Sequence, residues 1–210
     1  MCLMCLGVLL DSTLTFAPHV RHVSGKSFYH LRQLKTVRRS LSDAAAKTMV
    51  HAFIISRIDY CNSILYGVSA VHLRPLQSVL NSAARIILRK QRRDHITADI
   101  RDLLHWLPVQ RRIEYKMCML VYKCLHQLAP IYLSELCIPV AATATWSHLC
   151  SAVQGNLVIL YCSTKRYGQR SFAYSGPALW NSLPLTVRDP SLSLTQFCAQ
   201  LKSVVFSRAQ

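Results

Sequence analysis

Acidic residues are scarce in this chain of 210 residues, which has nine Asp and Glu against 25 Lys and Arg. Its formal net charge is therefore +16. A folded chain this basic is expected to meet an anionic partner, and nucleic acid and acidic membrane are the commonest such surfaces. Apolar residues make up 51% of the sequence, enough to bury a core, so wholesale disorder is not expected.

The sequence also lacks any uncharged apolar run long enough to cross a bilayer. Its first ten residues are almost wholly apolar, but they have no basic leading region and no small-residue cleavage site, and Asp11 follows directly. We therefore expect neither a signal peptide nor a transmembrane segment. The expectation is an intracellular protein, nuclear or cytoplasmic, that does not act at a membrane.

The nine cysteines do not have the loop spacing of a small disulfide-rich secreted protein. Most of them lie inside apolar helical patterns, as Cys118, Cys124 and Cys198 do. We interpret them as reduced, buried thiols.

A zinc site is the alternative use for the cysteines nearest the N-terminus. Cys2, Cys5, His19 and His22 have the spacing C-x2-C-x13-H-x2-H, in which both gaps closed by a histidine miss the usual zinc finger by one residue. Because the two cysteines also belong to an apolar strand pattern, we predict no metal site.

Hydrophobic periodicity predicts a mainly α-helical fold with a short strand at the N-terminus. The segment from Leu3 to Leu10 has the length and apolar content of a buried strand, closed by a turn that begins at Asp11. Helices are expected from Pro18 to about residue 39, from a cap at Ser42-Asp43 to about Tyr66, over 73–87, over 97–105, over 113–128 with Leu128 inward, around Trp180 over 176–183, and from a capping box of Ser193 and Gln196.

Domain boundaries are expected where this periodicity fails. Residues 140–168 are rich in Ala, Thr and Ser, and no Lys or Arg occurs from Cys124 to Thr164. The expected organisation is a strand at 1–16, a helical domain at 17–138, a linker at 139–168 and a helical segment at 169–210.

Basic side chains recur at helical spacing in two places, each on the side opposite an apolar stripe. The first basic row is Arg32, Lys35 and Arg39, and the second basic row is Arg85, Arg89, Arg92 and Arg93. Cations about one helical turn apart can reach successive phosphates. A solvated helix face is the alternative, but few acids lie nearby, so we predict that both rows contact nucleic acid in the parent protein.

Trp106, Trp180 and Tyr60 could stack on bases, but such residues more often anchor the packing of helices, and the HWLP and LWNSLP segments mix the two tryptophans with Leu and Pro. We therefore expect all three in the core. Asp59 has no nucleophile-and-base arrangement beside it. No catalytic residue is therefore predicted.

Five segments in the same order resemble those that follow the palm in jockey-type LINE (non-LTR retrotransposon) reverse transcriptases. Cys5 to His19 is similar to their "LGV-x-LD-x-x-L-x-F-x-x-H" segment, and Ser56 to Gly67 reads SRIDYCNSILYG where the family has "SRLDYCNSLLYG". Residues 76–85 match "LQ-x-x-x-N-x-AAR", and the segments LHWLPVQRRI at 104–113 and RSF through PALWNSLP at 170–184 complete the set. The resemblance covers nearly the whole chain.

The resemblance implies a right-handed polymerase whose palm holds catalytic aspartates on Mg²⁺ and whose helical thumb grips the primer–template duplex. The family supplies part of its two-metal site as adjacent Asp residues after an aromatic residue, and here no two acidic residues are neighbours. We therefore expect a thumb-like helical bundle with a strand or hairpin left from the palm, no polymerase activity, and no cofactor of its own, although the parent would need Mg²⁺.

Two functional hypotheses follow. In the first, the chain is a fragment of an RNA-directed DNA polymerase that at most binds an RNA or DNA duplex through its basic rows, with the parent's palm as a further partner. In the second, it is a decayed retroelement fragment with no selected activity. In either case, the N-terminal strand lacks its palm neighbours, and self-association through it is expected.

Overall fold

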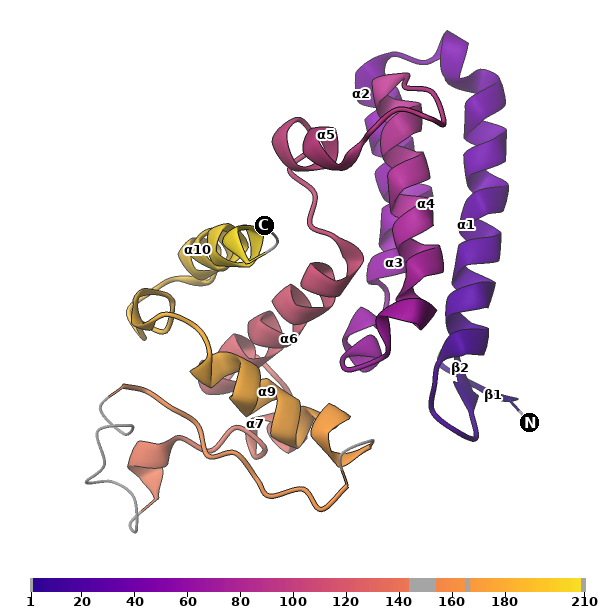
Figure 1. Cartoon of the computed structure of the whole chain (residues 1–210). Coiled ribbons are helices and arrows are strands. Elements are labelled where there is room, and N and C mark those ends of the chain that lie inside the picture. Colours follow the sequence, from indigo (N-terminus) through magenta and orange to yellow (C-terminus); the bar gives the residue numbers. More distant parts are fainter. Residues whose placement is uncertain (1, 144–153, 165–166, 209–210) are drawn as a thin grey trace. The chain divides into compact units, whose positions relative to one another are not determined.

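The structure is a computed structural model that describes residues 2–143, 154–164 and 167–208. These residues form a mainly α-helical fold with an N-terminal β-hairpin, as expected (Figure 1). The chain consists of two compact units, Met1–Arg112 and Ile113–Gln210. The boundary expected near residue 138 stays a prediction.

The N-terminus is a hairpin of two antiparallel strands, β1 (Cys2–Cys5) and β2 (Val8–Asp11), with Leu3 opposite Leu10. Leu6 and Gly7 form the turn with φ values of 46° and 79°. The single buried strand expected over 3–10 is therefore wrong. Leu3 is 66% exposed and Val8 alone in this stretch is buried, because a two-stranded sheet has too few neighbours to cover both of its faces.

Asp11 shapes the turn that leads from β2 into the first helix. Its carboxylate accepts hydrogen bonds from the Thr13 hydroxyl at 2.7 Å, from the Thr15 hydroxyl and amide at 2.8 and 3.0 Å, and from the Phe16 amide at 2.8 Å. Burial raises the pKa of Asp11, but these bonds favour the carboxylate more strongly, and the net pKa lies far below the ordinary value. The LDSTLTF segment (residues 10–16) thus has a structural role, because its Asp11 holds the turn between β2 and α1.

The first unit is a helical bundle made of α1 (Ala17–Val37), α2 (Asp43–Val50), α3 (Ser56–Asp59), α4 (Ala70–Leu88) and α5 (Thr97–Asp102). Helix α1 packs along α4, and α2 packs against α4 (Figure 1). The apolar stripe predicted for the third helix is confirmed, because Leu73, Leu76, Leu80, Ala83 and Ile87 are all buried. Ser42 caps α2 as predicted, since its side chain accepts from the Ala45 amide at 3.2 Å.

The second expected helix ends earlier than its periodicity predicts. It passes through a π-helical turn (His51–Ile55), and α3 stops at Asp59. Tyr60 is extended, Cys61 has a φ of 50°, and a 3₁₀ turn follows over Asn62–Leu65. Such a break leaves no trace in an apolar pattern, because 3₁₀ and α turns place apolar residues at similar spacings.

Residues of two motifs that are far apart in the sequence meet around Asp59. Its carboxylate pairs with Arg112 at 2.8 Å, and the Arg112 guanidinium lies over the Trp106 ring at 5.9 Å. Trp106 is 5% exposed and Trp180 is 3% exposed, so their expected core roles are confirmed. The core role expected for Tyr60 is wrong: it is 54% exposed, and its hydroxyl donates to the Leu6 carbonyl at 2.8 Å.

The second unit contains α7 (Ile131–Ser134), α9 (Phe172–Asn181) and α10 (Leu194–Ser207), and helix α6 (Val109–Leu125) includes the boundary between the units. Phe197 of α10 is fully buried and stacks on Tyr122 at 4.3 Å between ring centroids. A Cβ at Gly176 would lie 3.1 Å from Val121, so α9 approaches α6 more closely there than a larger residue would allow.

Two other predictions for this unit have clear outcomes. The capping box of Ser193 and Gln196 is confirmed at the start of α10. The inward position expected for Leu128 is wrong, because α6 ends at Leu125, Gln127 has a φ of 55° and Leu128 is 60% exposed.

Part of the segment expected as a linker is anchored. The Asn181 side chain exchanges two hydrogen bonds with the backbone of Leu157, both at 2.8 Å, and Trp180 Nε1 donates to the Gly155 carbonyl at 3.1 Å. Leu157 is buried as a result. Residues 144–153 of the expected linker lie outside the described residues.

Candidate nucleic-acid interface

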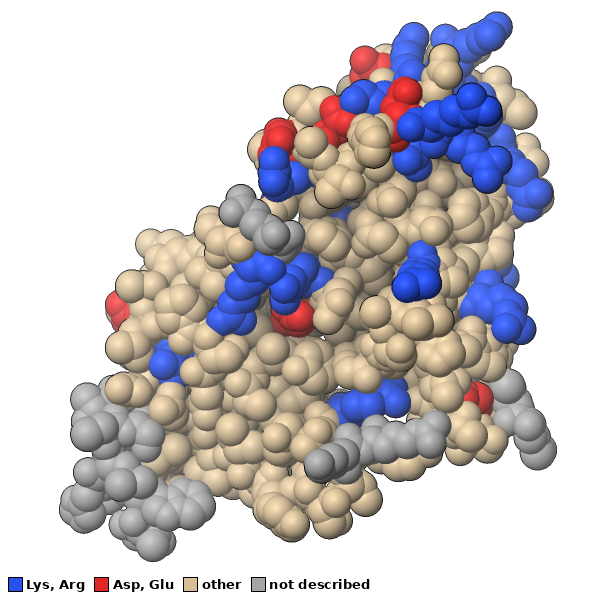
Figure 2. Space-filling model, in the orientation of Figure 1, with Lys and Arg blue, Asp and Glu red and all other residues tan. Residues whose placement is uncertain are grey.

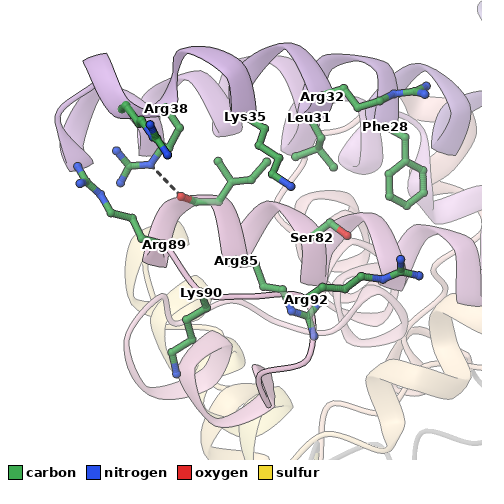
Figure 3. Close-up of a pocket in the computed structure, with 12 residues that line it drawn as sticks. Phe28, Leu31, Arg32, Lys35, Arg38, Ser82, Arg85, Arg89, Lys90 and Arg92 are labelled. Carbon is green, nitrogen blue, oxygen red and sulfur yellow. Dashed lines mark hydrogen bonds between the residues drawn. The ribbon is translucent and has the colours of Figure 1, made fainter.

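The two basic rows meet in the first unit. A groove of about 780 Å³ lies between α1 and α4 and the turns that follow them (Figure 3). We call it the basic groove. It is lined by Phe28, Leu31, Arg32, Lys35, Arg38 and Arg39 from one side, and by Ser82, Arg85, Ile86, Arg89, Lys90 and Arg92 from the other.

The groove contains six of the seven residues predicted to bind nucleic acid. All three cations of the first basic row line it, with Arg32 and Lys35 on α1 and Arg39 in the 3₁₀ turn after it. Of the second basic row, Arg85, Arg89 and Arg92 line it, and the exposed Arg93 does not. Figure 2 shows Lys and Arg side chains gathered at the end of the bundle where α1 and α4 finish.

The sequence patterns missed two cations of the groove, Arg38 and Lys90. Arg38 lies off the helical row, but α1 ends at Val37, and the tighter 3₁₀ turn over Arg38–Ser40 turns this side chain toward α4. Lys90 follows Arg89, whose left-handed conformation (φ 53°) ends α4. Each of these two cations lies where the chain turns at the end of a helix. The periodicity of charged residues along a helix does not predict where such a turn directs a side chain.

Several of these cations already have partners in the fold. Arg38 is 7% exposed, and its guanidinium donates hydrogen bonds to backbone carbonyls of α4 and of Leu41. It also forms an ion pair with Asp43. Lys90 pairs with Asp99 at 2.6 Å, and Arg89 approaches Asp43 at 3.5 Å. Arg85 donates to the Asp94 carbonyl at 3.1 Å.

Four cations of the groove have no ion-pair partner among the residues that the structure describes. They are Arg32, Lys35, Arg39 and Arg92, and all four are exposed. Their side chains can turn toward an anion without breaking an interaction that holds the fold. These four are therefore the best candidates for phosphate contacts.

The charged residues that line the groove are all cationic. Of its twelve lining residues, eight are Lys or Arg, and the other four are Phe28, Leu31, Ser82 and Ile86. At its edge lies the carboxylate of Asp43, whose pKa is lowered chiefly by the hydrogen bond from Arg38. Asp43 therefore stays ionised at neutral pH and offsets part of the charge of Arg38 and Arg89, but it pairs with none of Arg32, Lys35, Arg39 and Arg92.

Among the described residues, no group of three or more His, Cys, Asp or Glu side chains is placed to hold a metal ion. His19 is buried, and its Nδ1 lies 3.4 Å from the Leu9 amide, from which it accepts a hydrogen bond. In the same part of the chain, no helix has the length and apolar character needed to cross a membrane.

Comparison with known proteins adds no relative: no family model, no curated protein and no solved structure matches the chain. Function is therefore inferred from the residues of the groove and from the motifs in the sequence.

Proposed function

We propose that the chain is a nucleic-acid-binding part of a LINE-type reverse transcriptase, which lies after the palm and contacts the primer–template through the basic groove. One observation carries the proposal: two basic rows about fifty positions apart in the sequence line a single groove. Together the rows contribute to eight Lys and Arg side chains among twelve lining residues, which include no Asp or Glu. The ordered motifs of the sequence support the same origin.

Phosphate contact is the proposed mechanism. Arg32, Lys35, Arg39 and Arg92 are exposed and have no ion pair among the described residues, so each can neutralise one phosphate and release its counterions. Binding of this kind depends on backbone charge, and it is therefore expected to be insensitive to base sequence and steeply weakened by salt.

The chain is not proposed to catalyse DNA synthesis. Its nine acidic residues include no adjacent pair, and two-metal chemistry needs carboxylates close enough to share both ions. With an RNA template, a DNA primer, nucleotides and Mg²⁺, the purified chain is expected to leave the primer unextended. Extension that disappears when one of its own acids is replaced would contradict this.

The test of binding is a salt titration of a fluorescent duplex by anisotropy. Replacing Arg32, Lys35, Arg39 and Arg92 together with Gln is expected to weaken binding to every duplex sequence. The slope of log K against log salt should fall by about one unit for each phosphate that the variant no longer neutralises. Replacing the second basic row (Arg85, Arg89, Arg92 and Arg93) should act in the same direction.

A matched control removes the same charge elsewhere in the first unit. Arg21, Lys26, Lys47 and Arg74 are exposed and do not line the groove, so their replacement with Gln lowers net charge equally. We expect this variant to keep most of the wild-type slope. Equal slopes for the two variants would place the phosphate-binding residues elsewhere, and the absence of binding in the wild type would favour the decayed-fragment hypothesis.

A further inference from the structure

The floor of the basic groove is apolar, and a phosphate-binding surface does not require this. Phe28 and Leu31 of α1 and Ile86 of α4 are its apolar lining residues, and Figure 3 shows Phe28 and Leu31 pointing from α1 toward α4. Leu31 is 4% exposed and belongs to the core, whereas Phe28 and Ile86 are half-buried. The groove therefore offers part of an aromatic ring and part of an aliphatic side chain to whatever enters it.

A base-paired duplex cannot use this floor. Its phosphates lie on a convex surface, and the faces of its bases are covered by the neighbouring base pairs. The groove volume of about 780 Å³ is that of a small-molecule pocket, too small for a duplex to enter. A duplex can therefore meet the cations at the rim while the apolar floor stays empty.

An unpaired nucleotide can use both features at once. Proteins that bind single strands combine a cationic groove for the backbone with aromatic side chains on which bases stack. Here Arg32 and Lys35 lie on the same helix as Phe28, four and seven positions further on, which places them one and two turns beyond its ring. A base on Phe28 would have its phosphates beside these cations.

We propose that the basic groove binds an unpaired segment of the nucleic acid, with one base stacked on Phe28 and the adjoining phosphates on Arg32 and Lys35. This inference rests on the proposed function and narrows its ligand: a duplex with a single-stranded extension is bound in preference to a blunt one.

The test compares three fluorescent probes of equal sequence by anisotropy at one salt concentration: a blunt duplex, the same duplex with an unpaired extension, and the single strand alone. The wild-type chain is expected to bind the extended duplex and the single strand more tightly than the blunt duplex. Loss of one stacked base corresponds to roughly a fivefold to hundredfold loss of affinity.

Variants of Phe28 separate stacking from folding. Phe28→Leu keeps an apolar side chain on α1 and removes the ring, and it should abolish the preference for the extension. Phe28→Tyr should retain the preference. The matched control is Tyr29→Ala, since Tyr29 is the neighbouring aromatic, is 55% exposed and does not line the groove. Thermal melting of each variant checks that the fold is intact.

The outcomes distinguish the two proposals. Equal affinity of the wild type for blunt and extended duplexes, or an unchanged preference in Phe28→Leu, overturns the unpaired-segment proposal and leaves duplex binding standing. Failure to bind all three probes overturns the proposed function itself. Capture by phosphatidylserine vesicles in place of the oligonucleotides would overturn both, because an acidic lipid would then be the ligand of the apolar, cationic groove.

Discussion

Arg38 caps the C-terminal end of α4 by a hydrogen bond to Ile87. Its Nη2 donates to the Ile87 carbonyl at 2.9 Å, and the two residues are 49 positions apart in the sequence. Its Nε donates to the Ile86 carbonyl at 2.8 Å. The last carbonyls of a helix have no partner within the helix, and a guanidinium can serve two of them at once. A buried cation of the basic groove therefore holds the groove's two sides together (Figure 3).

Replacing Arg38 is expected to destabilise the first unit. Arg38→Ala leaves the Ile86 and Ile87 carbonyls without these donors, and we expect a loss of about 2–3 kcal/mol in the free energy of unfolding. Arg38→Lys should recover only part of it, because an ammonium lacks the planar fork. Denaturant titration gives the values. Arg39→Ala, at an exposed position, is the control, and an equal loss there would contradict the structural role of Arg38.

Asp11 is expected to make stability depend on pH in the acidic range. Because its folded-state pKa lies below the ordinary value of 3.8, the carboxylate stabilises the fold fully above that value. The contribution is lost as the pH falls through the ordinary pKa toward the lower, folded-state pKa. Asp11→Asn should therefore be less stable than the wild type near neutral pH, and the difference should shrink below about pH 4.

Urea titrations of both proteins across this pH range measure the difference directly. Glu135→Gln is the control, because Glu135 is exposed and its carboxylate has no hydrogen bond or ion pair among the described residues. A difference between the wild type and Asp11→Asn that is the same at every pH would assign the effect of Asp11 to its shape and not to its charge.

The hairpin turn can be improved by one substitution. Leu6 and Gly7 both have positive φ, which is the geometry of a two-residue hairpin turn that favours Asn-Gly. Leu6→Asn is expected to raise the free energy of unfolding by about 0.5–1 kcal/mol, since Asn adopts the left-handed conformation at lower cost than Leu. The side chain of Leu6 is 85% exposed, so little packing is removed. Thermal melting should show no such gain for Leu3→Asn, which lies in β1.

Self-association is expected to proceed through β1. This strand pairs with β2 on one side, its Leu3 and Met4 side chains are 66% and 62% exposed, and it carries no charge and no Pro. An uncharged apolar edge recruits another strand, and a single Lys is enough to discourage it. Met4→Lys should therefore lower the apparent mass in static light scattering. Leu103→Lys, at a similarly exposed apolar position away from the hairpin, should not, and an equal effect would show that net charge alone controls association.

Local patterns were sufficient for most helices and for much of the core. The apolar stripe of α4, the Ser42 cap and the capping box of α10 depend on residues within a few positions of one another, and the spacing of such residues is visible in the sequence. Burial of Trp106 and Trp180 was predicted for the same reason, since each lies in an apolar context.

Breaks in regular structure were harder to predict. The Leu6-Gly7 turn lacks the Asn or Asp that is usual in a two-residue hairpin turn, and no Gly or Pro marks the end of α3 before Tyr60. Tyr60 was misplaced for this reason. An aromatic residue at a helical spacing indicates a core position only while the helix continues, and here the chain turns one residue earlier.

The sequence by itself determined that the chain is mainly helical and that it carries two basic rows, because charge and periodicity are properties of neighbouring residues. Only the tertiary structure decided that the rows share one groove, that Arg38 is a structural cation within it, and that Phe28 lies on its floor. The packing of α1 against α4 brings together residues about fifty positions apart. That packing depends on how the apolar stripes of the two helices fit each other, and it cannot be predicted from the sequence of either helix alone.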